Sequence, residues 1–151
     1  MEAAIKDNIL TEIVGTWKLV SWKYENEDGK EVDFFGENPQ GILMYDKEGY
    51  MNVQIHHHTR PNFHTEGLVD GTAEETERGF KSYVAYYGKY YQEEPDMITH
   101  KVEGSLFPNW EGNIQKRYFK LSGNNLTLST PPLASGNKKI NFTLEWIRYT
   151  A

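Results

Sequence analysis

The residues best suited to chemistry lie in one stretch, residues 98–121, which polar and apolar alternation predicts to be two strands joined by a loop. In the second strand Gln115 and Arg117 share a face with Phe119, and lysines mark the opposite face as the solvated one. Because a buried guanidinium is expensive unless something pairs with it, this pattern indicates a pocket. Arg117 could hold a carboxylate, enolate or phenolate there; the alternative is an internal partner, such as Glu103 or a bridging water.

Three further side chains could act in the same pocket. His100 lies on the predicted inward face of the first strand, and a histidine has an ordinary pKa suited to proton transfer. Its alternative role is that of a hydrogen-bonded structural residue. Tyr86 and Tyr90 share the predicted inward face of the strand over residues 83–92. Their hydroxyls could donate hydrogen bonds to a carbonyl or enolate, or their rings could simply line the pocket.

The composition excludes several classes of function. Sixteen basic and 22 acidic residues give a net charge of −6, which argues against nucleic acid and membranes as partners. The absence of cysteine excludes disulfides and thiolate metal sites. The amino-terminal sequence lacks the pattern of a secretory signal, and no apolar run could span a bilayer, so we expect a cytoplasmic protein. With 151 residues, the chain is expected to form one domain, residues 1–151.

The sequence also predicts no metal and no cofactor. His56 and His58 would share one face of a strand, but the spacing to Glu66 is too long for a familiar metal-binding pattern, so a solvated histidine-rich loop is expected instead. No glycine-rich phosphate-binding loop, dinucleotide motif or nucleophilic serine motif is found.

The predicted elements are mostly short strands. Apolar spacing predicts a short helix over residues 3–13. Thr72 has the features of a helix N-cap, and a second short helix is expected to run from there to near Ser82, between the third and fourth strands. Eight strands with short connections favour an all-β sandwich or barrel. Eight antiparallel strands close an up-and-down barrel just wide enough for one small ligand.

Several stretches together carry a resemblance to a known family. They include GTWKLVSW at residues 15–22, FGENPQG at residues 35–41 and VEGSLFPNW at residues 102–110. In this combination the chain resembles the bacterial and fungal lipocalin-like domain family. The resemblance implies a lipocalin-like barrel and, for lipocalins at large, binding of small hydrophobic molecules. It also implies that Trp17 packs beneath Arg148 in a cation–π contact at the barrel floor.

The first functional hypothesis is therefore binding of a small hydrophobic or aromatic molecule, with an anionic or carbonyl end, inside the barrel. An alternative is a cofactor-free cyclase, isomerase or dehydratase with His100, Arg117 and Tyr86 as catalytic residues. A weaker alternative is an interaction domain with a filled core. The sequence is also compatible with a homodimer. The predicted ligand-binding residues are Tyr45, Tyr86, Tyr90, His100, Gln115, Arg117, Phe119 and Trp146.

Overall fold

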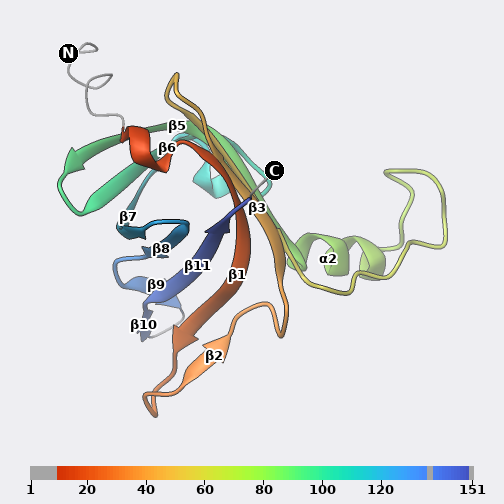
Figure 1. The fold of residues 1–151 in the computed structure, drawn as a ribbon. Coiled ribbons are helices and arrows are strands. Elements are labelled where there is room, and N and C mark those ends of the chain that lie inside the picture. The colour runs from red at the N-terminus through yellow and green to blue at the C-terminus, as the bar shows by residue number, and fades with distance from the viewer. Residues whose placement is uncertain (1–9, 136–137, 150–151) are drawn as a thin grey trace.

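The computed structural model describes residues 10–135 and 138–149, and Figure 1 shows their main feature, a closed antiparallel barrel. Neighbours in the chain pair around the wall, and the last strand pairs with the first to close it. The predicted eight-stranded barrel is thus confirmed within the described part of the chain. Its wall consists of β1 (Gly15–Glu25), β3 (Gln40–Tyr45), β4 (Tyr50–His56), β5 (Tyr83–Glu94), β6 (Met97–Ser105), β7 (Ile114–Ser122), β8 (Asn125–Ser129) and β11 (Phe142–Arg148).

Several smaller elements precede, follow or pair with the strands of this wall. The extra strand β2 (Glu31–Asp33) pairs with the end of β1, and β9 (Leu133–Ser135) forms a hairpin with β10 (Lys138–Ile140). A 3-10 turn, η1 (Thr11–Ile13), precedes the barrel, and a second, η2 (Pro108–Trp110), follows β6. Of the helix predicted over residues 3–13, residues 3–9 lie outside the described residues, and the end near Ile13 is this 3-10 turn.

A β-bulge in β1 changes which of its side chains face inward. Leu19 pairs with Trp146 of β11, but Ser21 pairs with the very next partner, Glu145, so β1 has one extra residue here. The extra residue, Val20, is exposed. Strict alternation from Leu19 would turn Trp22 outward, whereas the bulge turns it toward the interior.

Arg148 closes one end of the barrel. Its guanidinium carbon lies 4.2 Å from the centroid of the Trp17 ring, which is the contact that the lipocalin resemblance implies. The same guanidinium donates hydrogen bonds to the carbonyl oxygens of Val14 (2.8 Å) and Glu12 (2.9 Å). The Trp17 indole N–H donates to the Ile13 carbonyl at 3.0 Å. The η1 turn is therefore fixed across the end of the barrel by charge-assisted and neutral hydrogen bonds.

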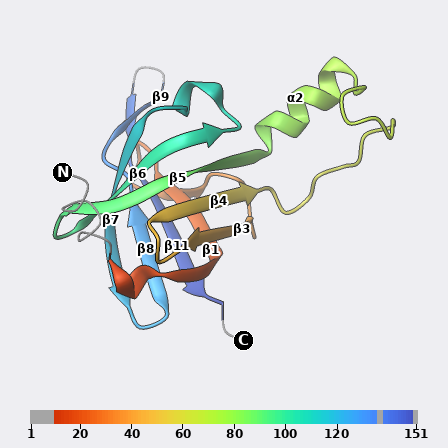
Figure 2. The same cartoon turned by 90° about the horizontal axis from the view of Figure 1, so that it is seen from above.

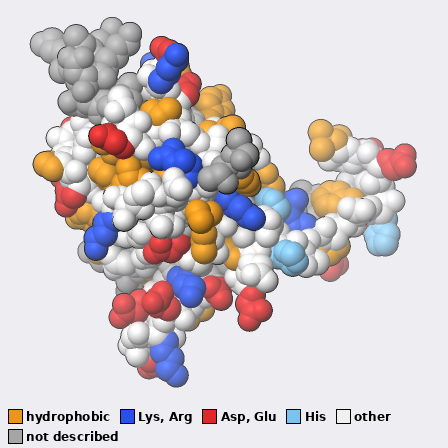
Figure 3. Space-filling model, viewed as in Figure 1, with side chains coloured by type: hydrophobic (Ala, Val, Ile, Leu, Met, Phe, Trp, Pro, Cys, Tyr) orange, Lys and Arg blue, Asp and Glu red, His pale blue; other side chains and the backbone are white. Residues whose placement is uncertain are grey.

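The segment between β4 and β5 projects from the barrel as an arm, residues 57–82, which contains α2 (Ala73–Lys81) (Figure 2). Figure 3 shows hydrophobic side chains at its far end, where Leu68 and Val69 are 93% and 88% exposed. Within the described residues, no helix has both the length and the apolar character that crossing a membrane would require.

Helix α2 begins with a capping box. The Glu75 N–H donates to the Thr72 hydroxyl at 3.1 Å, and the Glu75 carboxylate accepts from the Thr72 N–H at 3.0 Å. The second carboxylate oxygen accepts from the His64 N–H at 2.8 Å, which ties the irregular part of the arm to the helix. These backbone hydrogen bonds, with that of Thr72 the larger contribution, lower the pKa of Glu75.

Replacing the cap should loosen the arm without affecting the barrel. We expect Thr72→Ala to destabilise α2 by about 1 kcal/mol, which corresponds to roughly fivefold faster exchange of its amide hydrogens. Thr76→Ala, at an exposed position inside the same helix, is the matched control. Hydrogen exchange measured by NMR checks this, and equal exchange in the two variants would show that the cap contributes nothing.

Candidate ligand-binding site

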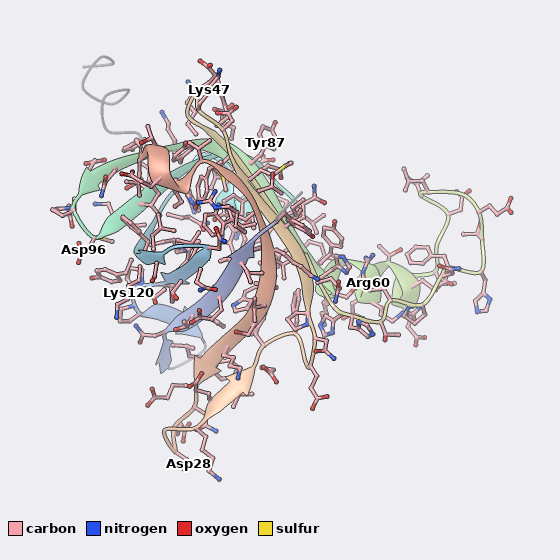
Figure 4. All side chains as sticks on the ribbon, in the orientation of Figure 1. Asp28, Lys47, Arg60, Tyr87, Asp96 and Lys120 are labelled. Atoms are coloured by element: carbon pink, nitrogen blue, oxygen red, sulfur yellow. The ribbon has the colours of Figure 1, made fainter. Side chains whose placement is uncertain are left out.

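The barrel interior contains a cavity of about 200 Å³. All eight strands of the wall contribute side chains to it, and most of these are aliphatic or aromatic. Since an apolar cavity of about 150 Å³ holds one benzene molecule, this cavity suits a single substituted aromatic ring. Lysines mark the outside of the barrel, as expected: Lys120 on β7 lies at the periphery of the molecule in Figure 4.

Two tyrosine rings contact His100, which is 2% exposed. The Tyr45 hydroxyl lies 2.7 Å from its Nε2 atom, and the Tyr86 hydroxyl lies 2.8 Å from its Nδ1 atom. Tyr90 packs edge-on against Tyr45, with ring centroids 4.7 Å apart. Burial, with a smaller contribution from the charge of Arg117, lowers the pKa of His100 to about 3. His100 is therefore neutral near pH 7.

This neutrality determines the direction of the two hydrogen bonds. A neutral imidazole has one N–H and one lone pair, so one tyrosine donates to His100 and the other accepts from it. If Tyr45 donates to Nε2, then Nδ1–H donates to Tyr86, whose own hydroxyl proton is free for a molecule in the cavity. The other tautomer would leave the buried Tyr45 hydroxyl with no acceptor for its proton within residues 10–135 and 138–149. Because such a group is costly, the first arrangement is favoured.

Arg117 projects into the same cavity from β7 and is half-buried. Its Nη2 donates to the Gln115 side-chain carbonyl at 2.6 Å, and its Nη1 donates to the Lys116 backbone carbonyl at 3.0 Å. Both acceptors are neutral. Glu103, the internal partner considered from the sequence, is exposed, and Arg117 forms no ion pair within the described residues. The charge of Arg117 is thus uncompensated there.

The charge of Arg117 also acts on the tyrosines. Burial raises the pKa of Tyr86, and the guanidinium opposes this increase by its charge and by a hydrogen bond. Burial likewise raises the pKa of Tyr45 well above its ordinary value, partly opposed by Arg117. Both phenols are therefore protonated at neutral pH and can donate hydrogen bonds.

The structure divides the predicted ligand-binding residues into two groups. Tyr86, His100, Arg117 and Trp146 line the cavity. The other four do not, for distinct physical reasons. Tyr45 and Gln115 lie behind the lining as the hydrogen-bond partners of His100 and Arg117, the Tyr90 hydroxyl donates to the Asp46 carbonyl, and Phe119 packs against the hydrophobic core.

The predicted ligand-binding residues do not include one aromatic group that lines the cavity. Trp22 is turned inward by the bulge, and its ring lies 4.7 Å from that of Phe34 and 6.1 Å from that of Phe142. All three line the cavity, as does Trp110, whose ring packs edge-on against Tyr86 at 5.9 Å. Trp110 therefore covers the cavity rather than the outer wall of the barrel.

Two of these lining residues carry buried polar atoms without partners. The indole N–H groups of Trp22 and Trp146 are buried, and neither has a hydrogen-bond partner within the described residues. A buried unsatisfied donor is costly. A bound molecule with oxygen acceptors would remove this cost.

The histidines at the end of β4 and in the arm do not form a comparable site. The His56 ring stacks on Tyr83, and the His57 ring packs against Phe35. No group of three or more side chains suited to hold a metal ion comes together within the part of the chain that the structure describes.

The closed barrel agrees with the match to a protein family. The chain belongs to the lipocalin-like domain family, whose model matches residues 14–149. It is 33% identical over 107 residues to the 4'-hydroxy-3'-methoxypropiophenone carrier protein ppsC of Aspergillus oryzae, an alignment that covers 64% of this chain and 94% of that protein. A crystal structure of a lipocalin-like protein from Bacteroides uniformis superposes with a TM-score of 0.46 at 15% identity, covering 91% of this chain and 99% of that chain.

Proposed function

We propose that this protein binds and carries a small aromatic molecule with a carbonyl or anionic end. The observation that carries this proposal is the pairing of an apolar cavity with a charged Arg117 that has no acidic partner in the described chain. Tyr86 would donate a second hydrogen bond to the same end of the ligand. The name of the Aspergillus relative supports an aryl ketone as the ligand class.

The geometry favours carriage over catalysis. A general base works best when its pKa lies near the operating pH. His100, with a pKa of about 3, is a weak base at pH 7, and both of its nitrogens already have hydrogen-bond partners. We therefore infer that His100 positions Tyr86 rather than moving a proton of the ligand.

Calorimetric titration with 4'-hydroxy-3'-methoxypropiophenone tests this function directly. We expect one binding site per chain and quantitative recovery of the unchanged compound by liquid chromatography and mass spectrometry. Conversion of the compound would favour the enzyme alternative. Failure to bind this compound and simpler aryl ketones would contradict the proposal.

Filling the cavity should abolish binding without unfolding the barrel. Leu144→Trp places a larger side chain into the cavity from β11. Overpacking costs about 1–3 kcal/mol of stability. Because the new side chain fills the volume that the ligand would occupy, we expect no heat of binding in the calorimetric titration. Ile147→Trp, at an exposed position of the same strand, is the matched control and should bind normally. Normal binding by a folded Leu144→Trp variant would place the ligand elsewhere.

A further inference from the structure

We propose that the cavity selects phenols with a para-acyl group and binds them as phenolate anions, with Arg117 as the counter-ion. The inference rests on the proposed function and adds the ionisation state of the ligand. Its first support is the charge balance of the site. No aspartate or glutamate is among the cavity-lining residues of the described chain, and the guanidinium is bonded only to neutral oxygens there. A bound anion would supply the missing charge.

The second support is the kind of hydrogen-bonding group around the cavity. Arg117 and the indoles of Trp22 and Trp146 are donors only. The Thr130 hydroxyl accepts from the Phe142 N–H at 2.9 Å, which occupies one of its two lone pairs, and it can also donate its own proton. With Tyr86 donating as derived above, the site is rich in donors and poor in acceptors. A neutral phenol would need an acceptor for its proton, whereas a phenolate oxygen only accepts.

The third support is the chemistry of the ligand class. An acyl group para to a phenolic oxygen is conjugated with it, so the negative charge of the phenolate is shared with the carbonyl oxygen. This sharing makes such phenols more acidic than tyrosine. It also means that Arg117 stabilises the anion whichever of the two oxygens faces it. The stabilisation of the anion by Arg117 therefore does not depend on the orientation of the ligand.

One effect opposes the proposal. An apolar cavity disfavours a charge, so burial alone raises the pKa of a phenol, as it does for Tyr86 and Tyr45. A hydrogen bond to a charged group contributes about 1.5–3 kcal/mol, or about 1–2 pKa units. Several donors act together here on one anion. We therefore expect the favourable interactions to exceed the cost of burial.

The test is a spectroscopic titration of bound 4'-hydroxy-3'-methoxypropiophenone. Phenolate forms of such compounds absorb at longer wavelength than the phenols, so absorbance reports ionisation directly. With protein in excess, we expect the pKa of the bound phenol to lie about one unit or more below that of the free compound. By linkage, affinity then rises with pH between the bound and the free pKa and levels off above the free value, a gain of about tenfold per unit.

Two controls separate this inference from the proposed function. The methyl ether 3',4'-dimethoxypropiophenone cannot ionise, so it should bind more weakly and without the rise in affinity. Arg117→Gln should bring the pKa of the bound phenol to or above the free value, whereas Arg78→Gln, at an exposed position on the arm, should leave it lowered.

The outcomes are distinguishable. Binding of both compounds with an unshifted or raised phenol pKa would overturn the phenolate proposal and leave the proposed function standing. A lowered pKa that persists in Arg117→Gln would overturn the role of Arg117 as counter-ion. Failure of both compounds to bind would contradict the proposed function and this inference with it.

Discussion

Arg117→Met should weaken the binding of 4'-hydroxy-3'-methoxypropiophenone by about 10- to 100-fold, the loss of one charge-assisted interaction. The same substitution should not lower the free energy of unfolding of the unliganded protein. Arg117 is half-buried with neutral partners only in the described chain, and replacing a buried charge by an apolar side chain of similar volume is often neutral or stabilising. Calorimetric titration and urea unfolding measure the two quantities.

This pair of results separates a binding residue from a structural one. If Arg117 served mainly to hold Gln115 in place, its loss would leave the buried Gln115 side-chain oxygen unsatisfied and lower stability by about 1–3 kcal/mol. Arg78→Met, on the exposed face of α2, is the matched control and should change neither quantity. A stability loss of that size with unchanged affinity would refute the role given to Arg117.

His100→Gln should make the protein less sensitive to acid. The pKa of His100 is about 3 in the folded protein and about 6.5 in an unfolded chain. Below pH 6.5 the unfolded state therefore binds one proton more than the folded state, and stability falls as the pH falls toward 3. This residue contributes a loss of about 1.4 kcal/mol per pH unit in that window. A glutamine cannot take up this proton.

Urea unfolding at pH 7.0 and pH 4.5 measures the effect. Between these values the wild type should lose about 2–3 kcal/mol more than His100→Gln does. At pH 7.0 the variant should be less stable by about 1–3 kcal/mol, because one of the buried tyrosine hydroxyls loses its partner. His64→Gln, on the exposed arm, serves as the matched control. Equal acid sensitivity of the wild type and His100→Gln would mean that His100 is not neutral in the folded protein.

The barrel and part of the site could be predicted because they depend on local alternation. The lysines on one face of β7 predicted that Arg117, on the other face, points inward. The apolar residues that share a face of β6 with His100 predicted the same for His100. Alternation along single strands does not predict which strands contact one another across the barrel interior. The bond between Tyr45 and His100 joins residues 55 positions apart on β3 and β6, and it depends on the closure and tilt of the whole barrel.

Trp22 shows a second limit of sequence reasoning. A bulge inserts one residue and reverses the direction of every later side chain in the strand. Nothing in the alternation of residues 15–25 marks its position, and the pairing of Leu19 and Ser21 with consecutive residues of β11 reveals it. Of the two unpartnered indoles, Trp146 was predicted to line the cavity, whereas Trp22 could be placed there only after this register was known.

The base of the arm has a consequence for how this fold can vary. The His57 N–H donates to the Ser82 carbonyl at 3.1 Å, so the two ends of the segment over residues 57–82 are neighbours. A segment whose two ends are already neighbours can become longer or shorter at a small cost in conformational entropy. This cost is about 0.6 kcal/mol for each doubling of its length. β4 and β5 pair directly with each other below it. The arm can therefore change in length and sequence while the strand pairing around the cavity is preserved.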